Sequence, residues 1–109
     1  EDTIDLNELL IARPAASFIM RISGQSMEDA GILDGDYVIV DRSLTPRPGQ
    51  IVIAALHGDL TIKYLHKYNG RFWLSPANCS YPEIELTKDD PVEIWGVVTG
   101  VFRRIPHIT

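Results

Sequence analysis

The chain has 109 residues, of which 45% are hydrophobic and 23% charged, and these values predict a single globular domain over residues 1–109. Its formal net charge of −5 disfavours strong direct binding to duplex DNA, because DNA-binding domains usually carry a basic face. The absence of any apolar run of about 18 residues argues against a membrane-spanning helix. A single cysteine, Cys79, excludes an internal disulfide, and it lacks the spaced Cys or His partners of a zinc site. We therefore expect a cytoplasmic protein, with no metal or cofactor.

The predicted elements begin with one or two helical turns at residues 5–10, for which Asp5 is a suitable N-cap. Aromatic and β-branched residues then predict a strand over residues 17–22. Another helical turn is predicted at residues 26–30 and should end at Gly31, because glycine readily takes the left-handed conformation that closes a helix. Helix is therefore expected only in these two short segments.

Strands account for the rest of the predicted fold. The apolar runs at residues 37–40 and 50–56 are typical of strands buried on both faces. Gly58-Asp59 and Asn69-Gly70 are typical two-residue hairpin turns. The strands around and after these turns are predicted at residues 51–56, 60–65, 64–68, 71–74, 83–86 and 92–103, the last with a bend at Gly96 or Gly100. This pattern predicts a mostly β fold, with folded sheets or a partial barrel and one or two short helical turns.

The segment Ser23-Gly24-Gln25-Ser26-Met27 lies between a predicted strand and a predicted helical turn. A serine at such a bend can act as a nucleophile, with nearby backbone N–H groups facing an oxyanion, or it can simply cap the helical turn. A nucleophilic serine needs a base, which is usually histidine. His57, His66 and His107 lie in a hairpin turn, after a strand and in the terminal tail, and all three are typical of surface histidines.

Lys63 is the other candidate base. It lies in the middle of a predicted strand, on the same face as Thr61 and Leu65. A lysine in this position can point to solvent, but a buried lysine loses hydration, so that its pKa falls and a neutral amine can accept a proton. Ser–Lys dyads are a known variant of the catalytic triad. The local pattern leaves both possibilities open and does not place Lys63 beside Ser26.

Two further polar features have ordinary structural interpretations. Arg103-Arg104 is the one notable basic cluster and is typical of a solvated tail. Asp34-Gly35-Asp36 is typical of a turn that leads into the next strand. Neither feature by itself indicates a catalytic role.

Five segments, in a fixed order along the chain, carry a resemblance to a known family. They are Ser23-Gly24-Gln25-Ser26-Met27, Gly31-Ile32-Leu33-Asp34-Gly35-Asp36, Gly49-Gln50-Ile51-Val52, Leu60-Thr61-Ile62-Lys63 and Ile94-Trp95-Gly96-Val97-Val98-Thr99-Gly100-Val101. With this order, and with 37 positions between Ser26 and Lys63, nearly the whole chain resembles the LexA/UmuD family of self-cleaving Ser–Lys peptidases. Residues 4–10 resemble the opening of the UmuD branch.

The resemblance implies a role for each residue of the motif and a LexA/signal-peptidase-like β fold. Ser26 would be the nucleophile and Lys63 the neutral general base that takes its proton. Backbone amides around Gln25 and Ser26 would stabilise the oxyanion, and Thr61 would orient the Lys63 amine. The resemblance implies neither a metal nor a cofactor.

Members of this family cut their own N-terminal arm at an Ala-Gly or Cys-Gly bond, and a RecA filament on single-stranded DNA stimulates the cut. This sequence has no Cys-Gly pair, and its one Ala-Gly pair, Ala30-Gly31, follows the expected nucleophile. The resemblance therefore implies a processed form without its arm. In the UmuD branch, such a form is a homodimer that joins a UmuC-like Y-family subunit in an error-prone translesion polymerase of the bacterial SOS response.

Three alternatives accompany this interpretation. The chain could be the carboxyl-terminal autocleavage and dimerisation domain of a LexA- or phage-type repressor, which would carry a helix-turn-helix upstream. A membrane-type signal peptidase uses a related dyad and fold, but the sequence shows no apolar anchor. A small β domain that only mediates binding would leave Ser26 and Lys63 without a role in chemistry.

Overall fold

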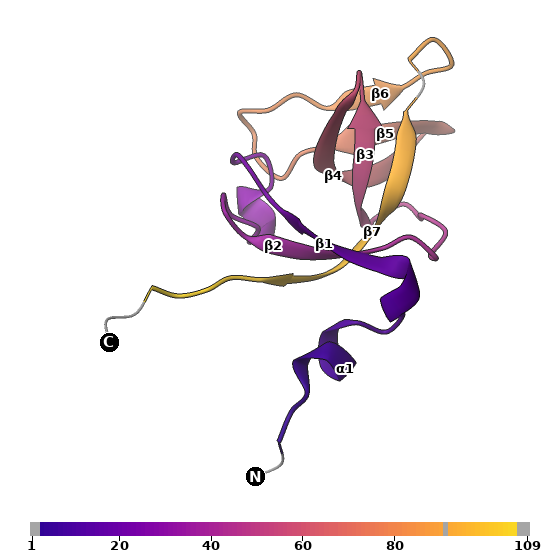
Figure 1. Cartoon of the computed structure of the whole chain (residues 1–109). Coiled ribbons are helices and arrows are strands. Elements are labelled where there is room, and N and C mark those ends of the chain that lie inside the picture. The colour runs from indigo at the N-terminus through magenta and orange to yellow at the C-terminus, as the bar shows by residue number, and fades with distance from the viewer. Residues whose placement is uncertain (1–2, 91, 107–109) are drawn as a thin grey trace.

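The computed structural model describes residues 3–90 and 92–106. This part of the chain folds into one open antiparallel sheet with the strand order β1-β2-β7-β3-β4-β5-β6 (Figure 1). The strands are β1 (Ser17–Arg21), β2 (Tyr37–Asp41), β3 (Ile51–Leu56), β4 (Asp59–Tyr68), β5 (Arg71–Ser75), β6 (Ile84–Leu86) and β7 (Glu93–Phe102). Helix is limited to α1 (Leu6–Leu10), η1 (Pro14–Ala16) and η2 (Glu28–Ala30). The predicted mostly β fold is confirmed.

The hairpin turns follow from the backbone angles that their residues accept. Asn69 and Gly70 have φ values of 50° and 76°, as the Asn-Gly turn predicts. The preceding turn differs from the prediction, because its two central residues are His57 and Gly58, with φ values of 51° and 85°. Asp59 is already paired with Leu56, so the predicted Gly58-Asp59 turn is wrong by one residue.

Other boundaries also shift slightly. The strands predicted at residues 60–65 and 64–68 are one continuous strand, β4, which pairs with β3 and then with β5. The helical turn predicted from residue 26 begins two residues later, at Glu28, and ends at Gly31 with a φ of 79°. Asp5 caps α1 as predicted, since its side chain accepts a hydrogen bond from the Asn7 amide.

Strand β7 joins the two halves of the sheet, because it pairs with β2 over its second part and with β3 over its first (Figure 1). Val97 is paired with Asp41 of β2 and with Val52 of β3, and the register shifts within both pairings. A Cβ atom at Gly96 would lie 2.6 Å from the Val40 Cγ1 atom and 2.9 Å from the Asp41 carbonyl oxygen. Glycine is therefore required for β7 to cross β2 this closely.

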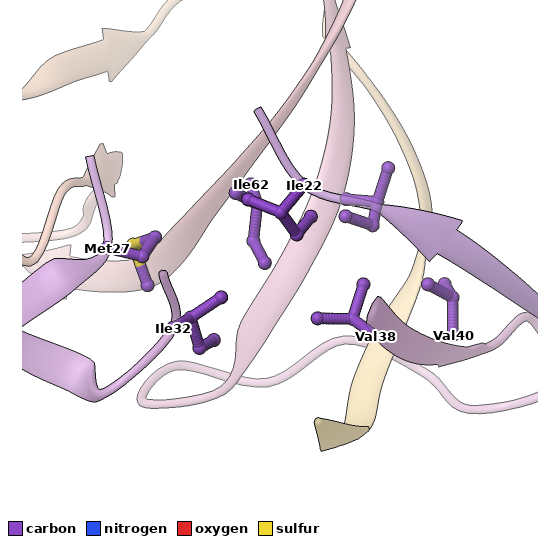
Figure 2. Packing of buried hydrophobic residues seen from close by; sticks show 7 residues of the cluster. Ile22, Met27, Ile32, Val38, Val40 and Ile62 are labelled. Atoms are coloured by element: carbon purple, nitrogen blue, oxygen red, sulfur yellow. The ribbon is translucent and has the colours of Figure 1, made fainter. Parts of the chain in front are cut away.

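The core has two hydrophobic clusters, because successive residues of a strand point to opposite faces. Figure 2 shows the first cluster, formed by Ile22, Met27, Ile32, Val38, Val40, Ile53 and Ile62. The second cluster is formed by Val52, Ala54, Leu65, Leu74 and Val97. Strand β3 contributes to both clusters, and so it is buried on both faces, as its apolar run predicts.

Helix α1 lies apart from the sheet in Figure 1 and has no buried residue. In the described part of the chain, no helix is long and apolar enough to cross a membrane.

Candidate active site

Ser26 lies in the segment from Ile22 to Leu33, the serine loop, which follows β1 and contains η2. Its side chain is half-buried. The N-cap of η2 is Met27, which makes no capping hydrogen bond with its side chain. The interpretation of Ser26 as a helix cap is therefore wrong, and its hydroxyl is free for another partner. The neighbouring Met27 side chain is 1% exposed and packs into the first core cluster (Figure 2), and this packing attaches the loop to the core.

A second loop, between β5 and β6, is hydrogen-bonded to the serine loop. The Ser26 carbonyl accepts a hydrogen bond from the Ala77 amide at 2.8 Å, and the Ala77 carbonyl accepts one from the Asp29 amide at 2.8 Å. The Asn78 side-chain amide donates to the Gln25 carbonyl at 2.8 Å. Sequence reasoning missed these residues, because Asn78 is 53 positions from Gln25 and looks like any polar loop residue.

The turn after η2 holds the start of the serine loop. The Gly24 amide donates to the Asp34 side chain at 2.8 Å, and Gly24 itself has a φ of 90°, which favours glycine. The Asp34-Gly35-Asp36 segment does form a turn, with Gly35 at a φ of 87°. It also fastens the loop in which Ser26 lies.

Lys63 lies in β4, directly opposite Val52 of β3, and is only 7% exposed. Its Nζ atom is 3.1 Å from the Ser26 Oγ atom, 2.8 Å from the Thr61 Oγ1 atom and 3.0 Å from the Ile62 carbonyl oxygen. The alternative in which Lys63 points to solvent is therefore wrong. The fold brings together two side chains that are 37 positions apart in the sequence.

Burial lowers the pKa of the Lys63 amine below its usual range, because the charged form loses hydration. Among the described residues, no carboxylate forms an ion pair with Lys63 that would restore its charge. A neutral amine has two N–H donors and one lone pair, which suits the three contacts. It can donate to Thr61 and to the Ile62 carbonyl while its lone pair accepts the Ser26 hydroxyl proton.

The backbone around the serine also offers free donors. Within residues 3–90 and 92–106, the N–H groups of Gln25 and Ser26 donate to no protein acceptor. Such groups at a sharp bend can stabilise an oxyanion, provided that they point to where it forms.

Neither of the two described histidines lies where it could act as the base for Ser26. His57 lies in the exposed β3–β4 turn, with its Nε2 atom 3.6 Å from the Asp90 Oδ1 atom. His66 is half-buried instead of exposed, and it stacks on Tyr64 with ring centroids 5.5 Å apart. His107 lies outside the described residues. Neither described histidine contacts Ser26.

Arg103 requires a correction, because the solvated-tail interpretation of Arg103-Arg104 is wrong for it. Its guanidinium forms two hydrogen bonds of 2.8 Å with the buried Asp36 carboxylate. A third hydrogen bond, of 2.7 Å, reaches the Gly31 carbonyl oxygen. This hydrogen-bonded guanidinium lowers the pKa of the Asp36 carboxyl group below its usual range. Arg104 is exposed, as expected of a tail residue.

Comparison with known proteins identifies the family. The model of the Peptidase S24-like family matches residues 1–99. The chain belongs to this family. The predicted resemblance to self-cleaving peptidases of the LexA/UmuD type is thereby confirmed.

Curated relatives come from two groups within the family. Protein MucA of Salmonella typhimurium is 44% identical over 97 residues, which are 88% of this chain and 66% of MucA. Protein ImpA of Shigella flexneri is 43% identical over 104 residues, 95% of this chain and 70% of ImpA. The LexA repressor of Syntrophotalea carbinolica is 46% identical over 87 residues, 80% of this chain and 43% of LexA. MucA and ImpA are UmuD-like, which supports the UmuD branch, and the chain spans about two thirds of their length.

Proposed function

We propose that this chain is a Ser–Lys peptidase domain in which Ser26 is the nucleophile and Lys63 the general base. The observation that carries the proposal is the 3.1 Å hydrogen bond between the Lys63 Nζ and Ser26 Oγ atoms. Burial of Lys63 supports it as well, because burial lowers the pKa of the amine and favours the neutral base. The 109 residues would form one domain, built on a single sheet.

The geometry supports an ordinary acyl-transfer sequence. The Lys63 lone pair takes the Ser26 proton while the Oγ atom attacks the carbonyl carbon of the peptide bond. The N–H groups of Gln25 and Ser26 would donate to the oxyanion that forms. The Lys63 ammonium then returns its proton to the leaving amine, so that the peptide bond breaks and an ester to Ser26 remains. Water hydrolyses this ester, with Lys63 again as the base.

Thr61 has a supporting role in this proposal. Its hydroxyl accepts from the Lys63 amine at 2.8 Å, and the Ile62 carbonyl accepts at 3.0 Å. Because both N–H groups of a neutral amine are then used in hydrogen bonds, its lone pair faces Ser26. Thr61 would thus orient the base without contacting the substrate.

The proposed substrate is the chain's own N-terminal arm, cut at an Ala-Gly or Cys-Gly bond, and the chain as given would be the processed product. The Ala30-Gly31 bond is unsuitable, because the Gly31 amide is bound to the Glu28 carbonyl at the end of η2, within the loop that carries Ser26. We therefore propose that the dyad acts on a bond outside the described residues.

The proposed role of the product is that of an accessory subunit in SOS mutagenesis. It would form a homodimer and join a UmuC-like Y-family subunit in an error-prone translesion polymerase, after cleavage stimulated by a RecA filament on single-stranded DNA. Support comes from the UmuD-like relatives MucA and ImpA, which align over most of this chain. Co-purification with a Y-family subunit from the same operon tests this role, and the absence of any association would count against it.

A LexA-type repressor domain is the second candidate, since LexA repressors are also 44–46% identical to this chain. The aligned residues cover only 40–43% of those repressors, compared with 66–70% of MucA and ImpA. The coding sequence upstream of Glu1 separates the two candidates. A short arm with an Ala-Gly or Cys-Gly bond supports the accessory subunit, and a helix-turn-helix supports the repressor.

The peptidase proposal is tested with an armed chain, which is this chain with an arm containing an Ala-Gly bond joined to its N-terminus. Self-cleavage of the armed chain is measured as the pH is raised. Cleavage should accelerate as Lys63 loses its proton. Ser26→Ala and Lys63→Ala should each slow it by about 10³-fold or more. Ser23→Ala and Lys67→Ala, in the same loop and strand, are matched controls that should cleave normally. Unchanged cleavage in either dyad variant would contradict the proposal.

A further inference from the structure

The serine loop runs from Ile22, at the end of β1, to Leu33, before the turn into β2. Asp36 contacts both ends of this loop. Its backbone carbonyl accepts from the Ile22 amide at 2.7 Å, and its carboxylate accepts from the Leu33 amide at 2.8 Å. A single residue thus ties the entry of the loop to its exit, with Ser26 between them.

Arg103 completes this attachment from the last strand of the chain. It follows β7 directly and is 67 positions from Asp36. Two parallel hydrogen bonds to a carboxylate fix the plane of a guanidinium and not only its charge. The same guanidinium donates to the Gly31 carbonyl, which belongs to the residue that ends η2. The end of β7 therefore holds the exit of the serine loop through two separate acceptors.

We propose that Arg103 and Asp36 are positioning residues that hold Ser26 at the distance from Lys63 needed for cleavage. This inference rests on the proposed peptidase function. Within the described residues, neither side chain forms a hydrogen bond with Ser26 or Lys63, so both would act only through the loop. A displacement of about 1 Å at a reacting group can lower the rate by about 10²-fold. Contacts that keep Ser26 in place can therefore have a large effect on the cleavage rate.

The chain supplies a matched control in a second ion pair. Arg13 and Asp41 also combine a half-exposed guanidinium with a buried carboxylate, with exposed side-chain fractions of 54% and 3% compared with 46% and 3% for Arg103 and Asp36. Arg13 approaches Asp41 with one contact of 3.2 Å, and Asp41 otherwise accepts from Ser43. This pair lies at the other end of β2 and does not contact the serine loop.

The test compares Arg103→Met with Arg13→Met in the armed chain, by the cleavage rate constant across pH and by Tm. We expect Arg103→Met to lower the plateau rate by about 10- to 100-fold. The apparent pKa of the profile should not change, because Lys63 stays buried. Arg13→Met removes a single contact of 3.2 Å outside the serine loop and should stay within about twofold of the original rate, whatever its loss of Tm. A rate loss that simply follows Tm in both variants would overturn the proposal.

Two more conservative variants test the same proposal if Arg103→Met fails to fold. Arg103→Lys can reach one carboxylate oxygen but cannot form the two-point contact, so its rate should lie between those of the original chain and Arg103→Met. Asp36→Asn should slow cleavage as well, and the double variant Asp36→Asn/Arg103→Met should be no slower than the slower single variant. Additive rate losses would contradict a shared action.

Amide hydrogen exchange separates this proposal from the peptidase proposal, since it requires no cleavage. Arg103→Met should speed exchange within residues 22–33 selectively, whereas Arg13→Met should leave those residues as they are. If the armed chain never cleaves and this exchange pattern appears, the peptidase proposal fails and the attachment stands. If residues 22–33 exchange at the original rate in Arg103→Met, the positioning proposal fails, whatever the peptidase does.

Discussion

The two members of the proposed dyad are held in different ways. Lys63 lies in the middle of β4, paired with Val52 and near the buried Ile62 and Leu65 of the same strand. Ser26 lies in a loop that is held by three buried side chains, Ile22, Met27 and Ile32, and by individual hydrogen bonds from distant residues. The ladder of a whole sheet thus fixes the base, whereas a few long-range contacts fix the nucleophile. Changes around the base should therefore affect stability, and changes around the loop should mainly affect rate.

The largest expected effect is at Lys63 itself. Lys63→Arg keeps a long cationic side chain, but a guanidinium cannot be deprotonated in a protein and so cannot act as the base. Self-cleavage of the armed chain should fall by about 10³-fold or more. Lys67→Arg, on the same strand, should cleave at the original rate. Substantial cleavage by Lys63→Arg would show that the position needs only a positive charge.

The junction of the two halves of the sheet should be the site where stability is most sensitive. Gly96→Ala places a Cβ atom 2.6 Å from the Val40 Cγ1 atom and should cost about 3 kcal/mol in the free energy of unfolding, the upper range for over-packing. Gly100→Ala meets nothing closer than the Ile39 Cδ1 atom at 3.3 Å and should cost about 1 kcal/mol. Urea unfolding of both variants measures the difference. Equal costs would contradict the close crossing of β2 and β7.

A contact to the serine loop should show the opposite behaviour. Asn78→Ala removes a half-buried side chain that donates to the Gln25 carbonyl and accepts from the Ser80 amide. We expect self-cleavage to slow by about tenfold, with a loss of only about 1 kcal/mol in the free energy of unfolding. The two quantities are measured by cleavage of the armed chain and by urea unfolding. A large loss of stability with no change in rate would break the distinction between loop and strand.

The smallest expected effect is the pH dependence that Lys63 gives to stability. Its pKa is lowered in the folded state, so between that value and about 10.5 the unfolded chain binds more protons. Stability should therefore rise with pH through this window, and the cost of burying the charge should be fully present below it. Lys63→Met should lose this rise and gain stability relative to the original chain toward lower pH. Parallel pH curves from urea unfolding would contradict a depressed pKa.

Local patterns predict most of the fold but only part of the site. The Asn69-Gly70 turn and the alternation of faces along β4 depend on neighbouring residues. Both are found where the sequence predicts them, since Ile62 packs in the first cluster and Leu65 in the second. The contact of Lys63 with Ser26 depends on the order of strands in the sheet, which periodicity does not specify. Family resemblance was needed to pair these two residues.

The attachment of the serine loop was beyond any local pattern. Arg103 and Asp36 are 67 positions apart, and each has an ordinary interpretation by itself, as a tail residue and as a turn residue. Their side chains meet only because β7 returns beside β2. Such contacts become visible in the folded chain, where a buried carboxylate needs a partner.

Lys63 is proposed to be a buried, readily deprotonated base in contact with Ser26, and the titration of Lys63 itself is the sharpest test of this proposal. The ¹³Cε resonance of Lys63 can be identified as the one missing from Lys63→Met. We expect this resonance to titrate below the ordinary lysine pKa of about 10.5. Titration at or above that value would show that the amine stays charged, and it would contradict the proposed general base.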